Sequence, residues 1–133
     1  MNASSPKPFT ADELVLLDRS RIDEIRQIER AVGRDDVLSG FVRTLQGNLE
    51  GFGAALSDYI GRGDITGAER AAHTLKGACL QLGVNALGEL FGDIESSVHA
   101  GNYSEAKRRF DGAASLIAQS LDALRASSAS SSR

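Results

Sequence analysis

The chain contains very few of the residues that cross-link or interrupt a polypeptide. It has one cysteine, one methionine, two prolines and no tryptophan among its 133 residues. Because Cys79 is the only cysteine, no disulfide can form within the chain, which indicates a reducing compartment. Both prolines precede residue 9, so no later helix has to stop at a proline. A disulfide scaffold is therefore excluded, and long uninterrupted helices are permitted.

Long apolar runs and a strong excess of one charge are also absent. No apolar stretch approaches the roughly 20 residues of a membrane span, and residues 1–9 lack the apolar core of a signal peptide. We therefore expect no membrane insertion and a cytoplasmic location. Lys and Arg number 15, Asp and Glu number 18, and the formal net charge of −3 gives no support for a nucleic-acid-binding surface.

What the sequence does contain is apolar residues at helical spacing. Hydrophobic residues make up 41% and charged residues 25% of the chain, which is ordinary for one globular domain of this length. No segment alternates with the period of a β-strand. We expect a flexible lead-in with a short helix over residues 1–17, a folded domain over residues 18–125 and a flexible serine-rich tail over residues 126–133.

Capping residues and apolar spacing together place the expected helices. Asp64, Asn85 and Ser104 are the expected N-caps of the last three. Because short connections favour antiparallel neighbours, we predict an all-α fold, an antiparallel up-down-up-down four-helix bundle with one or two additional short N-terminal helices. The short helices are expected over residues 11–17 and from about residue 18 to 32, and the long ones over residues 36–60, 65–82, 85–100 and 104–124.

One side of the helix expected over residues 65–82 carries a distinct combination of residues. At 100° per residue, His73 lies roughly 150° from the apolar face and should point into solvent. Lys76 follows at i+3 and Gly77 at i+4, while Glu69 at i−4 and Leu80 at i+7 extend the same side. An exposed imidazole beside an ammonium and a residue without a side chain indicates a place to bind, or to become, an anion. The apolar face itself consists of Ala68, Ala72, Leu75, Cys79 and Leu82.

A solvated surface histidine is the alternative interpretation of His73. A glycine inside a helix costs about 1 kcal/mol relative to alanine, so Gly77 favours a functional reason for the open side of the helix. Glycines also recur in the expected helices at positions 40, 47, 51, 67, 88 and 92, which weakens the argument from Gly77 alone.

A carboxylate on the following helix is predicted to reach the imidazole. His73 lies eleven residues before Val84, and Glu95 lies eleven residues after it. At 1.5 Å per residue both lie about 16 Å from the turn, so an antiparallel hairpin brings them level. If the Glu95 carboxylate accepts a hydrogen bond from Nδ1–H, the Nε2 lone pair of His73 remains free as a nucleophile. A solvated surface glutamate is the open alternative.

The residues around His73 also follow the pattern of a known family. The pattern consists of Ala72-His73-Thr74-Leu75-Lys76-Gly77, then Leu82-Gly83, Leu87 and Ile94-Glu95. It resembles the histidine-containing phosphotransfer (HPt) domain of bacterial multistep two-component phosphorelays, and the resemblance extends over roughly residues 18–124.

This resemblance implies a role for each residue near the imidazole. His73 would be phosphorylated on Nε2, and Lys76 would favour the phosphoryl charge. Gly77 would leave room for the phosphate and the partner, and Glu95 would orient the ring.

The resemblance further implies a phosphocarrier without ATP-dependent kinase activity of its own. The phosphoryl group would pass from the receiver domain of a hybrid sensor kinase, through His73, to the receiver domain of a response regulator. No acidic cluster in the sequence is suited to hold Mg²⁺ near His73, so the receiver is expected to bring the metal and most catalytic groups. The sequence has no P-loop. We expect a monomer with no cofactor or metal of its own, whose partner docks over Glu69 and Leu80.

The alternative functions are a docking module and a metal-dependent enzyme. A helical docking module that binds a regulator without accepting phosphate would be served equally well by an exposed Leu80 beside Gly77. A metal-dependent bundle enzyme needs inward-facing glutamate and histidine ligands, whereas His73 is expected to face outward. The second histidine, His99, is expected near a helix end, where it interacts with the helix dipole.

Overall fold

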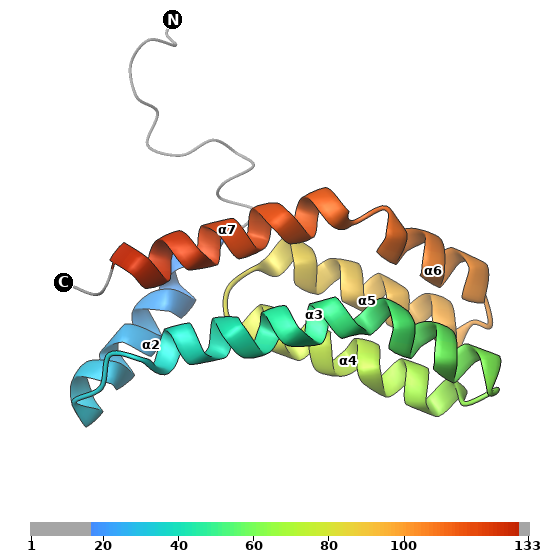
Figure 1. The fold of residues 1–133 in the computed structure, drawn as a ribbon, viewed down its shortest axis with the longest axis horizontal. Helices are drawn as coiled ribbons and strands as arrows, with labels where there is room; N and C mark the ends of the chain where they lie inside the picture. Colours follow the sequence, from blue (N-terminus) through green and yellow to red (C-terminus); the bar gives the residue numbers. More distant parts are fainter. Residues whose placement is uncertain (1–16, 131–133) are drawn as a thin grey trace, which may run out of the picture.

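The computed structural model describes residues 17–130, which form six α-helices and no β-strand within that range (Figure 1). The predicted all-α class is confirmed. The short helix expected over residues 11–17 lies outside the described residues except for Leu17, which is not helical. The helices are α2 (Arg19–Val32), α3 (Val37–Gly61), α4 (Ile65–Gln81), α5 (Asn85–His99), α6 (Tyr103–Asp111) and α7 (Ala114–Ser130).

The long helices form a four-membered antiparallel bundle. Helix α4 contacts both α3 and α5, while α6 and α7 follow one another along a fourth side, where they contact α5 and α3 (Figure 1). Helix α2 lies at the end of the bundle where α3 begins. The predicted bundle with an N-terminal addition is therefore the observed architecture. No helix in the described part of the chain is long and apolar enough to cross a membrane.

Short polar side chains begin two of the helices as expected. Oδ1 of Asp18 accepts a hydrogen bond from the Ser20 N–H at 3.0 Å, and Oδ1 of Asp64 accepts one from the Gly67 N–H at 2.9 Å. These bonds satisfy backbone donors that the first turn of a helix leaves unpaired. Asp64 is thus confirmed as the N-cap of α4, the helix that carries His73.

The turn between α4 and α5 requires a glycine. Gly83 has a φ of 83°, in the left-handed region, and a Cβ at this position would lie 2.6 Å from the Asp18 carbonyl oxygen. The Asp18 N–H donates to the Gly83 carbonyl at 2.6 Å, so the start of α2 is joined to this turn. The turn is tight, and it sets which residues of α4 and α5 lie opposite each other.

The expected N-caps Asn85 and Ser104 are wrong. Asn85 is the first residue of α5, and Val84 occupies the N-cap position without a side-chain hydrogen bond. Ser104 lies inside α6. The cap of that helix is Asn102, whose side chain accepts a hydrogen bond from the Glu105 N–H at 3.3 Å.

The last expected helix, over residues 104–124, is divided into α6 and α7. At the break, the Ala113 N–H donates to the Phe110 carbonyl at 3.0 Å, a bond to the third residue back that tightens the backbone locally. Helix α7 then continues to Ser130, beyond residue 125 where the domain was expected to end.

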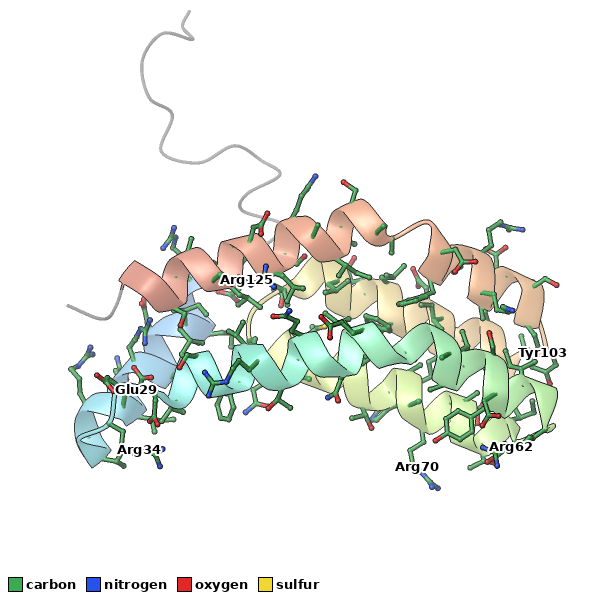
Figure 2. The ribbon with its side chains drawn as sticks, viewed as in Figure 1. Glu29, Arg34, Arg62, Arg70, Tyr103 and Arg125 are labelled. Atoms are coloured by element: carbon green, nitrogen blue, oxygen red, sulfur yellow. The ribbon has the colours of Figure 1, made fainter. Side chains whose placement is uncertain are left out.

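A buried carboxylate and the arginine that it binds join α2, α3 and α7 near one end of the bundle (Figure 2). Oε2 of Glu29 accepts from the Leu38 N–H at 2.9 Å, and Oε1 accepts from the Arg26 guanidinium at 2.7 Å. Arg26 also donates to the carbonyl oxygens of Ser127 and Ser128, at 2.7 and 3.2 Å. Burial alone would raise the pKa of Glu29, but these hydrogen bonds and the Arg26 charge hold that pKa below its ordinary value.

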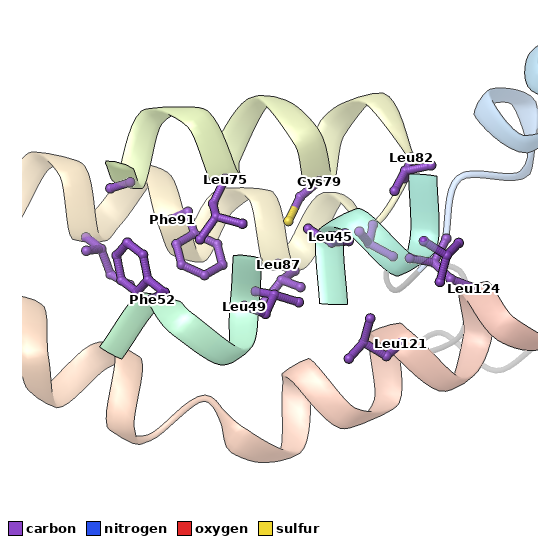
Figure 3. Packing of buried hydrophobic residues seen from close by; sticks show 14 of the residues in the cluster. Leu45, Leu49, Phe52, Leu75, Cys79, Leu82, Leu87, Phe91, Leu121 and Leu124 are labelled. Atoms are coloured by element: carbon purple, nitrogen blue, oxygen red, sulfur yellow. The ribbon is translucent and has the colours of Figure 1, made fainter. Parts of the chain in front are cut away.

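The core is built from the apolar faces of the helices (Figure 3). The ring of Phe52 on α3 lies 5.1 Å from that of Phe91 on α5 and 5.0 Å from that of Phe110 on α6. Cys79 is buried in the same core, and burial raises the pKa of its thiol to about 12, which keeps it protonated and unreactive at neutral pH. The buried side of α4 is the expected one and consists of Ala68, Ala72, Leu75 and Cys79.

Candidate functional site

Helices α4 and α5 run antiparallel on either side of Val84 and make the most extensive helix contact of the bundle. Residues equally far from Val84 along the chain face each other across this hairpin. Four such pairs lie along one side: Glu69 with His99, His73 with Glu95, Lys76 with Gly92, and Leu80 with Gly88. The candidate site is this row of pairs.

The contact predicted between His73 and Glu95 is present. Nδ1 of His73 lies 3.2 Å from Oε2 and 3.4 Å from Oε1 of the Glu95 carboxylate. The His73 side chain is 68% exposed, as expected for a residue opposite the apolar face of α4, and the Glu95 side chain is 29% exposed. Spacing along the hairpin was therefore sufficient to find this contact.

The contact with Glu95 determines which ring nitrogen of His73 carries the proton. An ionised carboxylate can only accept a hydrogen bond, so the contact requires a proton on Nδ1. In the neutral imidazole the lone pair then lies on Nε2. No described residue forms a hydrogen bond with Nε2, and the His73 side chain is largely exposed.

The Lys76 side chain lies across the hairpin, over Gly92. A Cβ at Gly92 would lie 3.6 Å from Cδ, 3.7 Å from Cε and 3.9 Å from Nζ of Lys76. The ammonium is thereby held over α5, one turn along the hairpin from the imidazole of His73. Its charge forms no ion pair with any residue in the described part of the chain. A cation without an ion-pair partner among the described residues therefore lies one helical turn from the imidazole.

Gly77 lies beside open space, whereas Leu80 is packed against the neighbouring helix. No atom lies within 4 Å of a Cβ at Gly77, so packing within this chain does not require glycine there. The expectation that Leu80 is exposed is wrong: it is half-buried against Gly88, where a Cβ would lie 2.8 Å from its Cδ2. The close approach of the Leu80 side chain therefore accounts for the glycine at position 88.

Sequence reasoning missed the partner of the second histidine. His99 is the last residue of α5, but its Nδ1 lies 2.6 Å from Oε2 of Glu69 on α4. The His99 side chain is 82% exposed and that of Glu69 is 27% exposed. The same count outward from Val84 that pairs His73 with Glu95 could have found this contact, because it depends on the same register.

The described residues contain no group of three or more histidine, cysteine, aspartate or glutamate side chains arranged to hold a metal ion. The two histidine–carboxylate contacts of the hairpin are pairs. His73 on α4 contacts one carboxylate on α5, and His99 on α5 contacts one carboxylate on α4.

Comparison with known proteins gives one result. The profile of the Hpt domain matches residues 36–127, from the start of α3 into α7, and leaves α2 outside the match. The chain has no significant match among curated proteins or among solved structures. The matched region covers more than half of the chain and contains every residue of the row of pairs described above.

Proposed function

Because the chain belongs to the Hpt domain family, we propose that His73 carries a phosphoryl group between receiver domains. Hpt domains are phosphotransfer intermediates of phosphorelays rather than kinases, and they interact with receiver domains. The single observation that carries the assignment to His73 is its contact with Glu95, which leaves Nε2 unprotonated in an open position.

The proposed step is a direct exchange of bonds at phosphorus. The Nε2 lone pair of His73 attacks the phosphorus of an aspartyl phosphate on the donor receiver. The bond between phosphorus and the aspartate oxygen breaks, and the aspartate leaves as a carboxylate. The proton on Nδ1 stays in its hydrogen bond with Glu95. Transfer to the second receiver reverses these bond changes, with an aspartate oxygen as the nucleophile.

Lys76 and Gly77 support this step in different ways. The Lys76 ammonium, lying over Gly92, offers positive charge to the phosphoryl oxygens without having to give up another partner. The space beside Gly77 leaves a path for the partner to reach His73, since no residue of this chain fills it. The roles are complementary, one electrostatic and one steric.

The partner completes the chemistry. Phosphoryl transfer normally requires Mg²⁺ and in-line geometry, and we assign both to the receiver domain, leaving this chain without a cofactor of its own. The proposed donor is the receiver of a hybrid sensor kinase, and the proposed acceptor is the receiver of a response regulator. We place the exchange in the cytoplasm, with this protein acting as a monomer and the receiver docking around His73, over Glu69 and the exposed part of Leu80.

The test is phosphorylation by phosphorylated receivers, followed by mapping of the acid-labile phosphate. His73→Gln should abolish acceptance while far-UV circular dichroism and melting temperature stay nearly unchanged, since an exposed substitution usually costs within about 0.5 kcal/mol. The chain has two histidines, and His99→Gln should still take the label at His73. Retained label in His73→Gln would remove His73 from this role. Receiver binding without any label in the wild type would instead indicate a docking module.

A further inference from the structure

We propose that His99 is a positioning residue that keeps the Glu69 carboxylate away from the nucleophilic Nε2 of His73. The proposal rests on the assignment of His73 as phosphoryl acceptor. It starts from the neighbouring contact on the same hairpin, in which Nδ1 of His99 lies 2.6 Å from Oε2 of Glu69.

Glu69 is a potential competitor for the imidazole of His73. It lies four residues before His73 on α4, and residues at this spacing are neighbours on a helix surface. Side chains on a helix lean toward its N-terminus, which directs the His73 ring toward the turn that carries Glu69.

A second carboxylate beside the ring would act at Nε2 of His73. Glu95 already occupies Nδ1 of His73, so Nε2 is the ring nitrogen that a second carboxylate would meet. A carboxylate at Nε2 would favour a proton there, because it can only accept. That proton would occupy the lone pair that has to attack phosphorus.

His99 removes this competitor by giving it another donor. Its Nδ1–H donates to Oε2 of Glu69, from the last residue of α5, and draws the carboxylate across the hairpin. Each carboxylate then serves the histidine of the opposite helix: Glu95 serves His73, and Glu69 serves His99. With this crossed pairing, no residue in the described part of the chain accepts a hydrogen bond at Nε2 of His73.

The experiment measures the tautomer of His73 by ring-nitrogen NMR on the intact protein. His99→Ala should release Glu69 and shift the ratio of His73 tautomers toward Nε2–H by roughly two- to fivefold, the range of a single surface hydrogen bond to a carboxylate. His99→Asn should retain the wild-type ratio, because the amide nitrogen of Asn lies close to the position of Nδ1 and also donates.

A second substitution identifies the competitor. His99→Ala combined with Glu69→Ala should return the tautomer ratio of His73 to its wild-type value, since no carboxylate is then released. The proposal is overturned if His99→Ala leaves the ratio unchanged, if His99→Asn shifts it as far as alanine does, or if the double variant does not restore it.

Labelling with phosphoramidate separates this proposal from the function on which it rests. The Nε2 lone pair attacks phosphorus, the P–N bond of the reagent breaks, and ammonia leaves. We expect His99→Ala to lower the labelling rate of His73 by the same two- to fivefold and the double variant to recover it. Failure of the wild type to accept phosphate from any receiver would refute the proposed function, while a restored tautomer ratio in the double variant would still support the role of His99.

Discussion

At the scale of single residues, the orientation of the His73 ring depends on an acceptor atom of Glu95. Glu95→Gln keeps an oxygen that can accept from Nδ1–H, whereas Glu95→Ala removes it. We therefore expect phosphate acceptance to fall by less than about threefold in Glu95→Gln and by about two- to tenfold in Glu95→Ala. Ring-nitrogen NMR should show the Nδ1–H tautomer maintained only in the first variant.

The outcome that contradicts this account is an equal tautomer ratio in wild type and Glu95→Ala. Thermal melts provide the control, because the Glu95 carboxylate is partly exposed and contacts a largely exposed ring, so both substitutions should leave the melting temperature nearly unchanged.

A second prediction at this scale concerns Gly92, which the Lys76 side chain crosses. Gly92→Ala places its Cβ at ordinary contact distance, 3.6 Å or more from Lys76, so transfer should continue at the wild-type rate. Helix propensity should raise the free energy of unfolding by up to about 1 kcal/mol. Gly92→Leu should displace the ammonium and slow labelling by phosphoramidate by about two- to tenfold, as Lys76→Ala should.

The matched control for the leucine variant is Gly51→Leu on α3, where no atom lies within 4 Å of a Cβ. It adds the same side chain to an exposed helix surface and should leave labelling unchanged. If Gly92→Leu also labels at the wild-type rate, the position of the Lys76 ammonium does not matter for transfer.

At the scale of the elements, α2 is held to the bundle by the buried carboxylate of Glu29. Its pKa is held below the ordinary value of 4.5, so the stability it contributes is present above about pH 4.5 and is lost as the pH falls through the folded-state pKa. Glu29→Gln leaves Arg26 without its charged acceptor and should lower the free energy of unfolding at pH 7 by about 1–3 kcal/mol. Urea denaturation should show this difference shrinking below about pH 4.5.

The same helix offers the control. Glu24 forms the corresponding exposed pair with Arg21, at the same i,i+3 spacing. Glu24→Gln should change the free energy of unfolding by less than about 0.5 kcal/mol at pH 7. Equal effects of the two substitutions would mean that burial of Glu29 does not determine its contribution.

At the scale of the whole molecule, the bundle is held by packing at sites separate from the exposed chemistry. Phe91 is fully buried and contacts both Phe52 and Phe110. Phe91→Ala should lower the free energy of unfolding in urea by about 3–5 kcal/mol, because it leaves a cavity among the remaining rings. Phe91→Leu fills part of that space and should lower it by about 1–3 kcal/mol.

Phe41 on α3 is the comparison for this prediction, because it is 40% exposed. Phe41→Ala should cost clearly less than Phe91→Ala, at about 1 kcal/mol or below, in the same urea titration. A cost equal to that of Phe91→Ala would show that the end of the bundle near α2 contributes as much as its centre.

The sequence by itself determined most of the helices and the register of the α4/α5 hairpin, but not the break between α6 and α7. Apolar spacing and the cap at Asp64 act within one or two turns of chain, so they can be read without knowing what packs against them. The contact between His73 and Glu95 followed as well, because residues at equal distances from a short turn lie level in an antiparallel hairpin. The same count outward from Val84 also places His99 level with Glu69, although the sequence analysis did not predict that contact.

Only the tertiary structure decided how the side chains share the space between helices. Leu80 is half-buried because Gly88 leaves room on α5, and the two residues belong to different helices. Glu29 is buried because α2 meets α3 and α7, although in sequence it looks like any exposed partner of an arginine. Such placements depend on the sizes and hydrogen-bond donors of residues that are distant in sequence. The apolar pattern within a single helix therefore cannot predict them.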